Sequence, residues 1–255
     1  MYRHLALILF VLPAFPIPKD AATLAEAGRD ALWKGDYGKS AELFEQAVKL
    51  APNSSEYHLW LGRAYGRRAE NSSLLTAARW ASRCRQQFEK AVQLDAKNLE
   101  AISDLFSYYL EAPGIMGGGV DKAERLASRI EPLDAAQYHH ARARIAEKRK
   151  QWETAEEEYR AAVDQAPDKS GRLTDLASFL AKRGRTTEAD EAFARAEALA
   201  PGKPALIFAR ASVYVETGIQ LETARSLLKR YLDLPLTHAD PPRWEAEKLL
   251  RQAGG

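Results

Sequence analysis

After residue 20, small and apolar residues recur every three or four positions in a succession of short stretches, which is the spacing of one face of an α-helix. Three of these stretches align with one another: GDYGKSAELFEQAVKLAPN (35–53), KQWETAEEEYRAAVDQAPD (150–168) and GRTTEADEAFARAEALAPG (184–202). Each has Ala-Pro near its end and an aromatic residue eight positions before that proline, namely Phe44, Tyr159 and Phe193. The repetition predicts one helical unit that is used several times.

A second helix precedes each of these stretches and is clearest in SEYHLWLGRAYG (55–66). Leu61, Gly62 and Tyr65 match the Leu-Gly-x-x-Tyr part of the tetratricopeptide signature, and Pro167 and Pro201 lie 34 residues apart, which is the period of that repeat. From residue 21 onward the chain therefore resembles the tetratricopeptide repeat (TPR) family. The resemblance implies an all-α fold, a TPR α-solenoid built as a right-handed superhelix of helix hairpins with a C-terminal capping helix.

In the register of that family, residues 21–236 divide into six TPR-like repeats: 21–54, 55–98, 99–135, 136–169, 170–203 and 204–236. The sixth is degenerate, because Tyr231 stands where the repeat has a small residue. Residues 237–255 are expected to form the capping helix and tail, with Asp240 as the N-cap. Within a repeat, a small residue on the first helix lets the second helix approach closely, and the aromatic residue fills the space beside it. Phe44, Tyr159 and Phe193 are therefore expected in the core.

The segment APGIMGGG (112–119) contains four glycines and leads into a helical pattern, which raises the question of a phosphate-binding loop. A Walker motif requires Gly-Lys-Ser/Thr, but Gly119 is followed by Val120, and such loops follow a strand whereas this one follows a helix. We interpret the segment as a structural turn whose glycines allow positive φ. A contact with a ligand or partner is the alternative. The residues of this structural loop are Pro113, Gly114, Gly117, Gly118 and Gly119.

A second insertion adds about ten residues to the second repeat. Its apolar positions continue at helical spacing through Cys84 and Phe88, so the second helix of that repeat is expected to extend backward to an N-cap at Ser72 or Ser73. Because the turns inside the repeats lie on one edge of a solenoid, the long helix and the glycine-rich loop should touch. We expect Ile115 and Met116 to cover Leu74, Leu75 or Trp80.

TPR proteins typically bind partners in a concave groove that is lined by the first helix of each repeat, and the resemblance implies such a groove here. Basic residues predominate in its lining, so an acidic segment or a C-terminal carboxylate is the ligand that its arginines would favour. An ordinary solvated face is the alternative for any single arginine. The expected lining residues are Arg29, Trp33, Leu59, Arg63, Arg67, His140, Arg144, Lys148, Lys182 and Phe208.

The resemblance thus implies a non-enzymatic scaffold or adaptor that binds a protein or an extended peptide. The alternative function is a small-ligand-binding accessory of an envelope transport system. It rests on a limited likeness: a glycine-rich stretch that leads into Asp-Lys-Ala resembles the periplasmic TPR components of some solute transporters. An open groove across several repeats would favour the scaffold, whereas a closed pocket with converging polar groups would favour the ligand-binding accessory.

Composition and motifs add mainly exclusions. The 37 basic and 35 acidic residues give a formal charge of +2, which lacks the basic excess of a nucleic-acid-binding protein. Cys84 is the only cysteine, so no intramolecular disulfide forms. His139 and His140 are adjacent and point about 100° apart on a helix, which does not make a shared metal site. No nucleophile motif is present. We expect no catalytic residue, metal or cofactor.

The first residues, MYRHLALILFVLPAFPIPKD, carry a basic residue, then an apolar stretch that is shorter than an ordinary membrane span, and then prolines. This pattern is typical of a secretory signal peptide over residues 1–20. An uncleaved anchor is the alternative, because no clean Ala-x-Ala cleavage site follows the apolar stretch. We therefore expect a periplasmic or secreted protein with no further membrane insertion.

Overall fold

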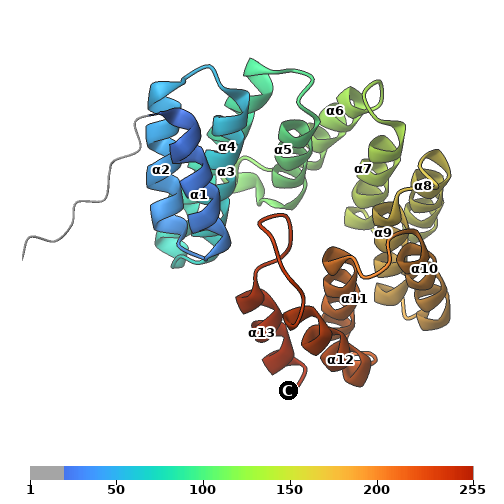
Figure 1. Ribbon diagram of the computed structural model, residues 1–255. Helices are drawn as coiled ribbons and strands as arrows, with labels where there is room; N and C mark the ends of the chain where they lie inside the picture. The colour runs from blue at the N-terminus through green and yellow to red at the C-terminus, as the bar shows by residue number, and fades with distance from the viewer. Residues whose placement is uncertain (1–19, 255) are drawn as a thin grey trace, which may run out of the picture.

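The computed structural model describes residues 20–254, apart from the side chains of Leu74 and Leu75. These residues form thirteen α-helices and one short 3-10 helix, and they contain no β-strand. The helices follow one another as hairpins that stack into a curved solenoid (Figure 1). The predicted all-helical solenoid is therefore confirmed. The predicted signal peptide lies outside the described residues, except for Asp20.

Each hairpin consists of an inner helix followed by an outer helix. The inner helices are α1 (Ala21–Trp33), α3 (Ser55–Glu70), α5 (Leu99–Glu111), α7 (Ala135–Lys148), α9 (Ser170–Lys182) and α11 (Pro204–Thr217). The outer helices are α2 (Tyr37–Leu50), α4 (Leu74–Leu94), α6 (Val120–Ile130), α8 (Trp152–Gln165), α10 (Thr186–Leu199) and α12 (Leu221–Leu232). The 3-10 helix η1 (Gly114–Met116) lies between α5 and α6, and α13 (Arg243–Gln252) follows α12. One hairpin falls in each of the six sequence ranges, to within one residue at the boundaries.

Polar side chains determine where several of these helices begin. Asp20, Asp36, Ser54, Asn98 and Asp134 each stand just before a helix, and the side chain of each accepts a hydrogen bond from the backbone N–H three residues later. The first amide groups of a helix have no partner within the helix, so these bonds supply one. They fix the starts of α1, α2, α3, α5 and α7.

The packing inside a hairpin depends on a small residue that faces an aromatic ring. A Cβ placed on Gly28 would lie 2.8 Å from the Phe44 ring, and one on Gly62 would lie 2.5 Å from the Phe88 ring. Both distances are shorter than a carbon–carbon contact, so the two helices are close enough to exclude any side chain there. Phe44 is fully buried, as its position in the repeat predicts. Tyr159 and Phe193 are also buried, at 5% and 4% exposure.

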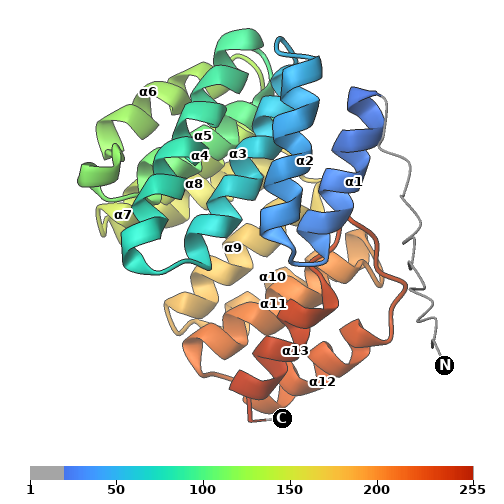
Figure 2. The ribbon, with the colours of Figure 1, turned by 90° about the vertical axis from the view of Figure 1, so that its left-hand side faces the viewer.

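The curvature of the solenoid follows from which helices touch. The backbones of consecutive inner helices approach one another closely from α1 to α11. Within residues 20–254 the backbones of consecutive outer helices do not, and long side chains such as Arg83 of α4 and Glu45 of α2 bridge the gap. The inner row is therefore the shorter one, and the stack bends toward it, as in other solenoids. The bend brings the last helices back toward the first ones across the hollow side (Figures 1 and 2).

The C-terminal helix α13 packs against α12 and α11, and its Ala246 is fully buried. The expectation that Asp240 caps this helix is wrong. The helix begins after Pro242, and the Asp240 carboxylate instead accepts hydrogen bonds from the backbone N–H and the hydroxyl of Thr237. Because prolines 241 and 242 are poor partners for an N-cap, lacking an N–H, Asp240 closes the preceding turn instead.

Candidate functional site

Three adjoining pockets form one groove on the hollow side of the solenoid, over α1, α3 and α5. The middle pocket shares Arg29 and Trp60 with the pocket on one side, and it shares Arg63 and Arg67 with the pocket on the other. We call the surface centred on these four residues the concave groove. It crosses three hairpins, so it is long enough for an extended segment to run across several repeats.

Trp60, which the sequence analysis did not single out, lies at the centre of the concave groove. The guanidinium carbon of Arg63 lies 4.6 Å from the centre of the Trp60 ring, and that of Arg29 lies 5.7 Å from it. The Trp60 ring also stacks on Phe44, with centroids 6.1 Å apart. Cation–π contacts of this kind hold the two arginines against the groove floor. The sequence signal was available, because Trp60 is adjacent to the predicted lining residue Leu59.

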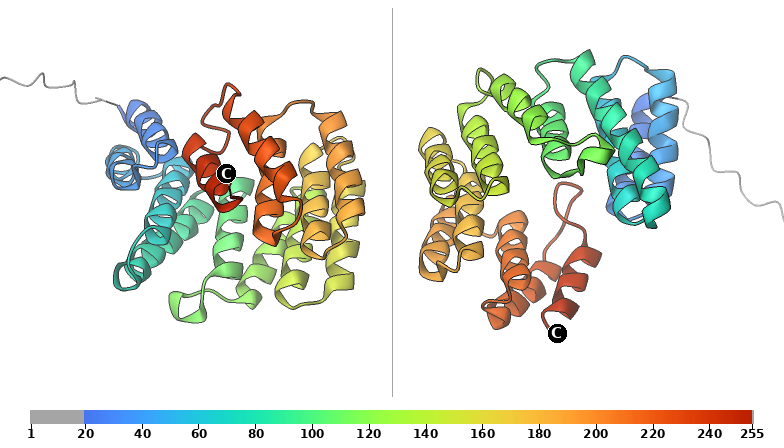
Figure 3. Two further views of the ribbon diagram at one scale, coloured as in Figure 1. Left: turned by 90° about the horizontal axis from the view of Figure 1, so that it is seen from below. Right: turned by 180° about the vertical axis from the view of Figure 1, so that it is seen from behind.

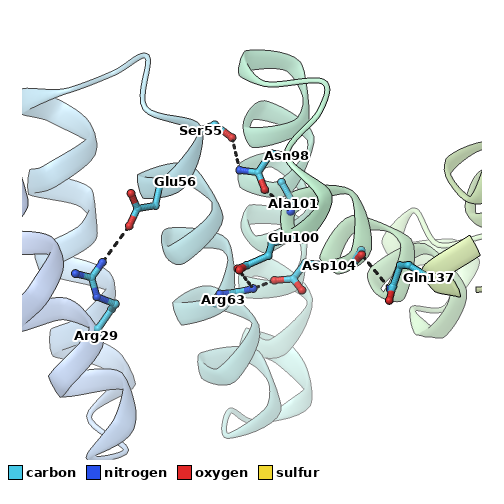
Figure 4. A network of polar contacts seen from close by, with 10 residues as sticks. Arg29, Ser55, Glu56, Arg63, Asn98, Glu100, Ala101, Asp104 and Gln137 are labelled. Carbon is cyan, nitrogen blue, oxygen red and sulfur yellow. Dashed lines mark hydrogen bonds and ion pairs between the residues drawn. The ribbon is translucent and has the colours of Figure 1, made fainter. Parts of the chain in front are cut away.

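Apart from Arg67, the arginines and lysines predicted to line the groove are paired with carboxylates on the neighbouring inner helix. Arg29 of α1 contacts Glu56 of α3 at 3.1 Å. Arg63 of α3 contacts Glu100 at 3.0 Å and Asp104 at 2.6 Å, both on α5 (Figure 4). These contacts connect successive inner helices across the hollow side. We call the series the charge ladder.

The charge ladder continues through the later hairpins. Arg144 and Lys148 of α7 contact the two carboxylate oxygens of Glu111 on α5, at 3.2 and 2.9 Å. Lys182 of α9 contacts Glu216 of α11 at 3.1 Å. The positive charge expected along the groove is therefore largely balanced from within the protein. Partly exposed ion pairs of this kind contribute little net stability, roughly 0–1 kcal/mol each, so an incoming ligand can exchange with them.

Burial and pairing together shift the pKa values of two ladder carboxylates in opposite directions. Burial raises the pKa of Asp104 above its ordinary value, although Arg63 pulls in the other direction. Burial also acts on Glu111, but Lys148 and Arg144 outweigh it and hold the Glu111 pKa below its ordinary value. Because Glu111 accepts hydrogen bonds from two cations at once, it is the better-compensated of the two acids.

Three of the predicted lining residues are occupied by contacts within the protein and do not present a free side chain to the groove. Leu59 is only 2% exposed and forms part of the floor. Phe208 is half-buried and packs on Tyr231 at the edge of the last core cluster, with ring centroids 5.2 Å apart. His140 lies against the ring of Tyr159 and 3.6 Å from Asp175, and burial, together with Arg172 and Arg144, lowers its pKa to about 3. His140 is therefore a neutral packing residue at ordinary pH.

Trp33 and Arg67 do line the groove, but both contact the far end of the chain. The indole N–H of Trp33 donates to the backbone carbonyl of Asp240 at 3.0 Å. The Arg67 guanidinium contacts Glu70 on its own helix at 3.2 Å and also the carboxylate of Glu245 on α13. Nothing in the local sequence around Trp33 or Arg67 indicated these partners.

The two insertions build an apolar pocket at one end of the concave groove. It has a volume of about 490 Å³ and lies between α3, α4, α5 and the loop after α5. The buried floor is formed by Cys84 and Phe88 of α4, with Met116 of η1 at the side. Sequence analysis placed the two insertions together but did not find the pocket, because the pocket depends on how far α3 and α5 stand apart.

The glycine-rich loop is a tight turn that lies against α4. Gly117 has a φ of 84°, and a Cβ on Gly118 would lie 1.8 Å from the carbonyl oxygen of Ala112, so no other residue fits there. Lys122, which a phosphate loop would direct at its ligand, donates to the Gly117 carbonyl at 2.7 Å. Of the remaining loop residues, Pro113 lines the apolar pocket, Gly114 begins η1, and Gly119 stands just before α6.

The contact between loop and long helix differs from the expected one. Helix α4 is extended backward to Ser73, and Gly117 lies against the Arg85 side chain on it. Ile115, however, is 95% exposed, so its expected role as a cover for α4 is wrong. Trp80 is covered instead by Arg68, whose guanidinium carbon lies 3.8 Å from its ring centre, and by Tyr65. The expectation for Leu74 and Leu75 falls on side chains outside the described ones.

The candidate metal ligands and the cysteine of the described residues are arranged as follows. Within residues 20–254 no three His, Cys, Asp or Glu side chains gather as a metal site would require. Cys84 is 3% exposed, and burial raises the pKa of its thiol to about 12, which keeps it as an unreactive thiol at neutral pH. Over the same residues, no helix is both long enough and apolar enough to cross a bilayer.

Stacked helix hairpins with a touching inner row and a groove on the hollow side define a helical-repeat solenoid. Among solved structures, the chain is similar to TTC0263, a thermophilic TPR protein of Thermus thermophilus, with a TM-score of 0.58 and 20% identity over 76% of this chain and 99% of that one. It is similar to PilF of Pseudomonas aeruginosa, with a TM-score of 0.51 and 12% identity over 91% and 97% of the two chains. The fold is therefore that of TPR proteins.

A third similar structure comes from the APC/C hetero-tetramer Cut9–Hcn1, with a TM-score of 0.52 and 15% identity over 92% of this chain and 43% of that one. At these identities the likeness concerns the fold. No protein-family model matches the chain, and no curated protein matches its sequence.

Proposed function

We propose that the protein is a non-enzymatic scaffold that binds an extended segment of another protein along its concave groove. The observation that carries the proposal is the apolar pocket of about 490 Å³ at one end of the groove. Both departures from the regular repeat, the long α4 and the glycine-rich loop, contribute to its lining. An apolar pocket that opens into a longer polar groove suits a large apolar side chain on an extended segment, which anchors while its backbone runs along the groove.

The same proposal includes an acidic partner segment. The charge ladder balances Arg29, Arg63, Arg144 and Lys148 internally, so these residues attract an acidic segment less than their number suggests. Arg67 differs from these four residues, because it contacts a carboxylate from a distant part of the chain, that of Glu245. Its planar guanidinium is suited to carboxylates. The alternative role in binding a small ligand has no comparable support, since the pockets adjoin one another in an open groove.

The proposal is tested by filling the apolar pocket. In Ala69→Trp an indole ring replaces a small residue of the pocket lining, and in Ala194→Trp the same change is made on the exposed face of α10 as a matched control. Tagged proteins are used to capture partners from the cell-envelope fraction of the source organism. We expect wild type and Ala194→Trp to capture a partner protein that Ala69→Trp does not capture. Identical capture by all three proteins would show that the groove is not the binding surface.

We also propose that the protein is exported to the cell envelope, on the strength of the signal-like pattern of residues 1–20. Cell fractionation followed by mass spectrometry of the N-terminus tests this. A chain that begins near residue 20 in the envelope or the medium fits a cleaved signal, and an intact chain in the membrane fraction fits an anchor. An intact chain in the cytosol would contradict export.

A further inference from the structure

The C-terminal segment, residues 237–245, lies on the concave groove of the first two hairpins. The Trp33 indole donates to the Asp240 carbonyl across 207 residues of sequence, and Arg67 contacts the Glu245 carboxylate. His238 and Asp240 also line the middle pocket of the groove, beside Arg29 and Trp60. Figure 3 shows the loop that leads into α13 close to α1 and α3. The chain thus places a segment of its own on the surface proposed for a partner.

The aromatic contacts of this segment are the kind that recognise a peptide. The His238 ring lies 5.4 Å from that of Trp33, and His238 Nε2 lies 3.3 Å from Asp30. Trp244 meets Tyr37 edge to face at 6.5 Å, and its ring lies over Gly35, which has a φ of 83°. Aromatic rings with a polar edge give contact area at a small entropic cost, which is why they are common in recognition surfaces.

The contact between residues 237–245 and the groove is more exposed than the core and leaves one hydrogen-bond donor unpaired within residues 20–254. The side chain of His238 is 47% exposed, and residues 237–239 are all exposed. The indole N–H of Trp244 is buried without a hydrogen-bond partner among the described residues. A buried unpaired donor weakens an interface by the desolvation of that group. In contrast, α13 is held at the other end of the solenoid by Ala246 in the core. The hydroxyl of Tyr231 donates to the Pro241 carbonyl, which tethers the middle of the segment to α12.

We propose that residues 237–245 act as an intramolecular ligand of the concave groove, and that a partner displaces them with a segment of the same chemistry, an aromatic residue next to a carboxylate. The inference rests on the proposed binding role of the groove and names the class of segment that it takes. A tethered segment competes at an effective concentration far above that of a free partner. The apparent affinity for a partner is then the intrinsic affinity of the free groove multiplied by the fraction of molecules in which the segment is released.

The experiment adds the segment to the protein as a separate peptide. The probe is a fluorescein-labelled peptide of residues 236–248, LTHADPPRWEAEK, and binding to the full chain is followed by fluorescence anisotropy. The release variant is Trp244→Ala with Glu245→Ala, which removes the segment's contacts with Tyr37 and Arg67 and leaves the groove intact. The matched control is Glu247→Ala with Lys248→Ala, two exposed residues of the same helix. We expect the release variant to bind the peptide at least about tenfold more tightly than wild type and the control.

A peptide in which the same Trp and Glu are replaced by Ala should lose this binding, and Trp33→Ala in the release background should lose it as well. A second measurement needs no variant: excess peptide should increase hydrogen exchange at residues 237–240 of the wild-type chain, because the peptide displaces them. Equal affinity for the three proteins, no binding to a folded release variant, or unchanged exchange in wild type would each overturn the proposal.

These outcomes separate the two proposals. If the peptide fails to bind while Ala69→Trp still abolishes partner capture, the segment is a structural clasp and the binding role of the groove stands. If the peptide binds the release variant while capture is the same for Ala69→Trp and Ala194→Trp, the segment is a ligand of the groove and the proposed partner site in the apolar pocket is wrong.

Discussion

Two glycines one turn apart in α3 provide a sharp test of how closely the hairpins pack. A Cβ on Gly62 would lie 2.5 Å from the buried Phe88 ring, whereas a Cβ on Gly66 would lie 3.4 Å from the Cys84 sulfur, an ordinary contact. Both changes to alanine favour the helix by about 1 kcal/mol, because alanine loses less backbone entropy than glycine. Only Gly62→Ala overpacks the core, at a cost of roughly 1–3 kcal/mol.

The two variants should therefore move in different directions. Gly66→Ala is expected to raise the free energy of unfolding by up to about 1 kcal/mol, and Gly62→Ala to lie about 1–3 kcal/mol below it. Urea denaturation followed by far-UV circular dichroism gives both values against wild type. Repeating Gly62→Ala in a Phe88→Leu background should reduce its effect, because the smaller side chain leaves room for the methyl group. Equal stability of the two alanine variants would refute the close-packing explanation.

Two further predictions concern His140 and the glycine-rich loop. The folded pKa of His140 is lowered to about 3 from its ordinary 6.5, so the unfolded chain binds the proton first, and stability is lost as pH falls from 6.5 toward 3. The loss in the free energy of unfolding is on the order of 2 kcal/mol at pH 5, and His140→Gln should remove it. Denaturation of both proteins at pH 7.5 and pH 5 measures this. An equal loss of stability between the two pH values in both proteins would show that His140 is not buried as a neutral group. Gly118→Ala would bring its Cβ 1.8 Å from the Ala112 carbonyl, whereas a Cβ on Gly114 meets nothing within 4 Å, so thermal unfolding should show Gly118→Ala less stable than Gly114→Ala by about 1–3 kcal/mol.

The sequence predicted the hairpins well because the information for them is local. The aromatic positions Phe44, Tyr159 and Phe193 recur at the same distance from a proline, and each is buried in the structure. Helix periodicity, capping residues and the small residue opposite the ring all act within about one repeat length, so a single sequence contains them. The same reasoning placed the long α4 beside the glycine-rich loop.

Apart from the cap expected at Asp240, the failures arose where side chains depend on residues in other repeats. Ile115 was expected to cover α4, but the tight turn at Gly117 and Gly118 directs the loop against Arg85 and leaves Ile115 exposed. The arginines of the inner helices suggested a basic groove, but the register between hairpins sets Arg29 against Glu56 and Arg63 against Asp104. Sequence position alone does not say which of two facing helices supplies the partner of a charge.

By itself, then, the sequence determined the helix hairpins, their order and their packing residues, because period and spacing are properties of neighbouring positions. Only the tertiary structure decided the apolar pocket beside Cys84, the internal balance of the groove charges, and the contact of Trp33 with Asp240. Those features depend on the small bend between one hairpin and the next, summed over the whole solenoid. That sum brings His238 and Asp240 onto the first helix, and no local pattern in the sequence contains it.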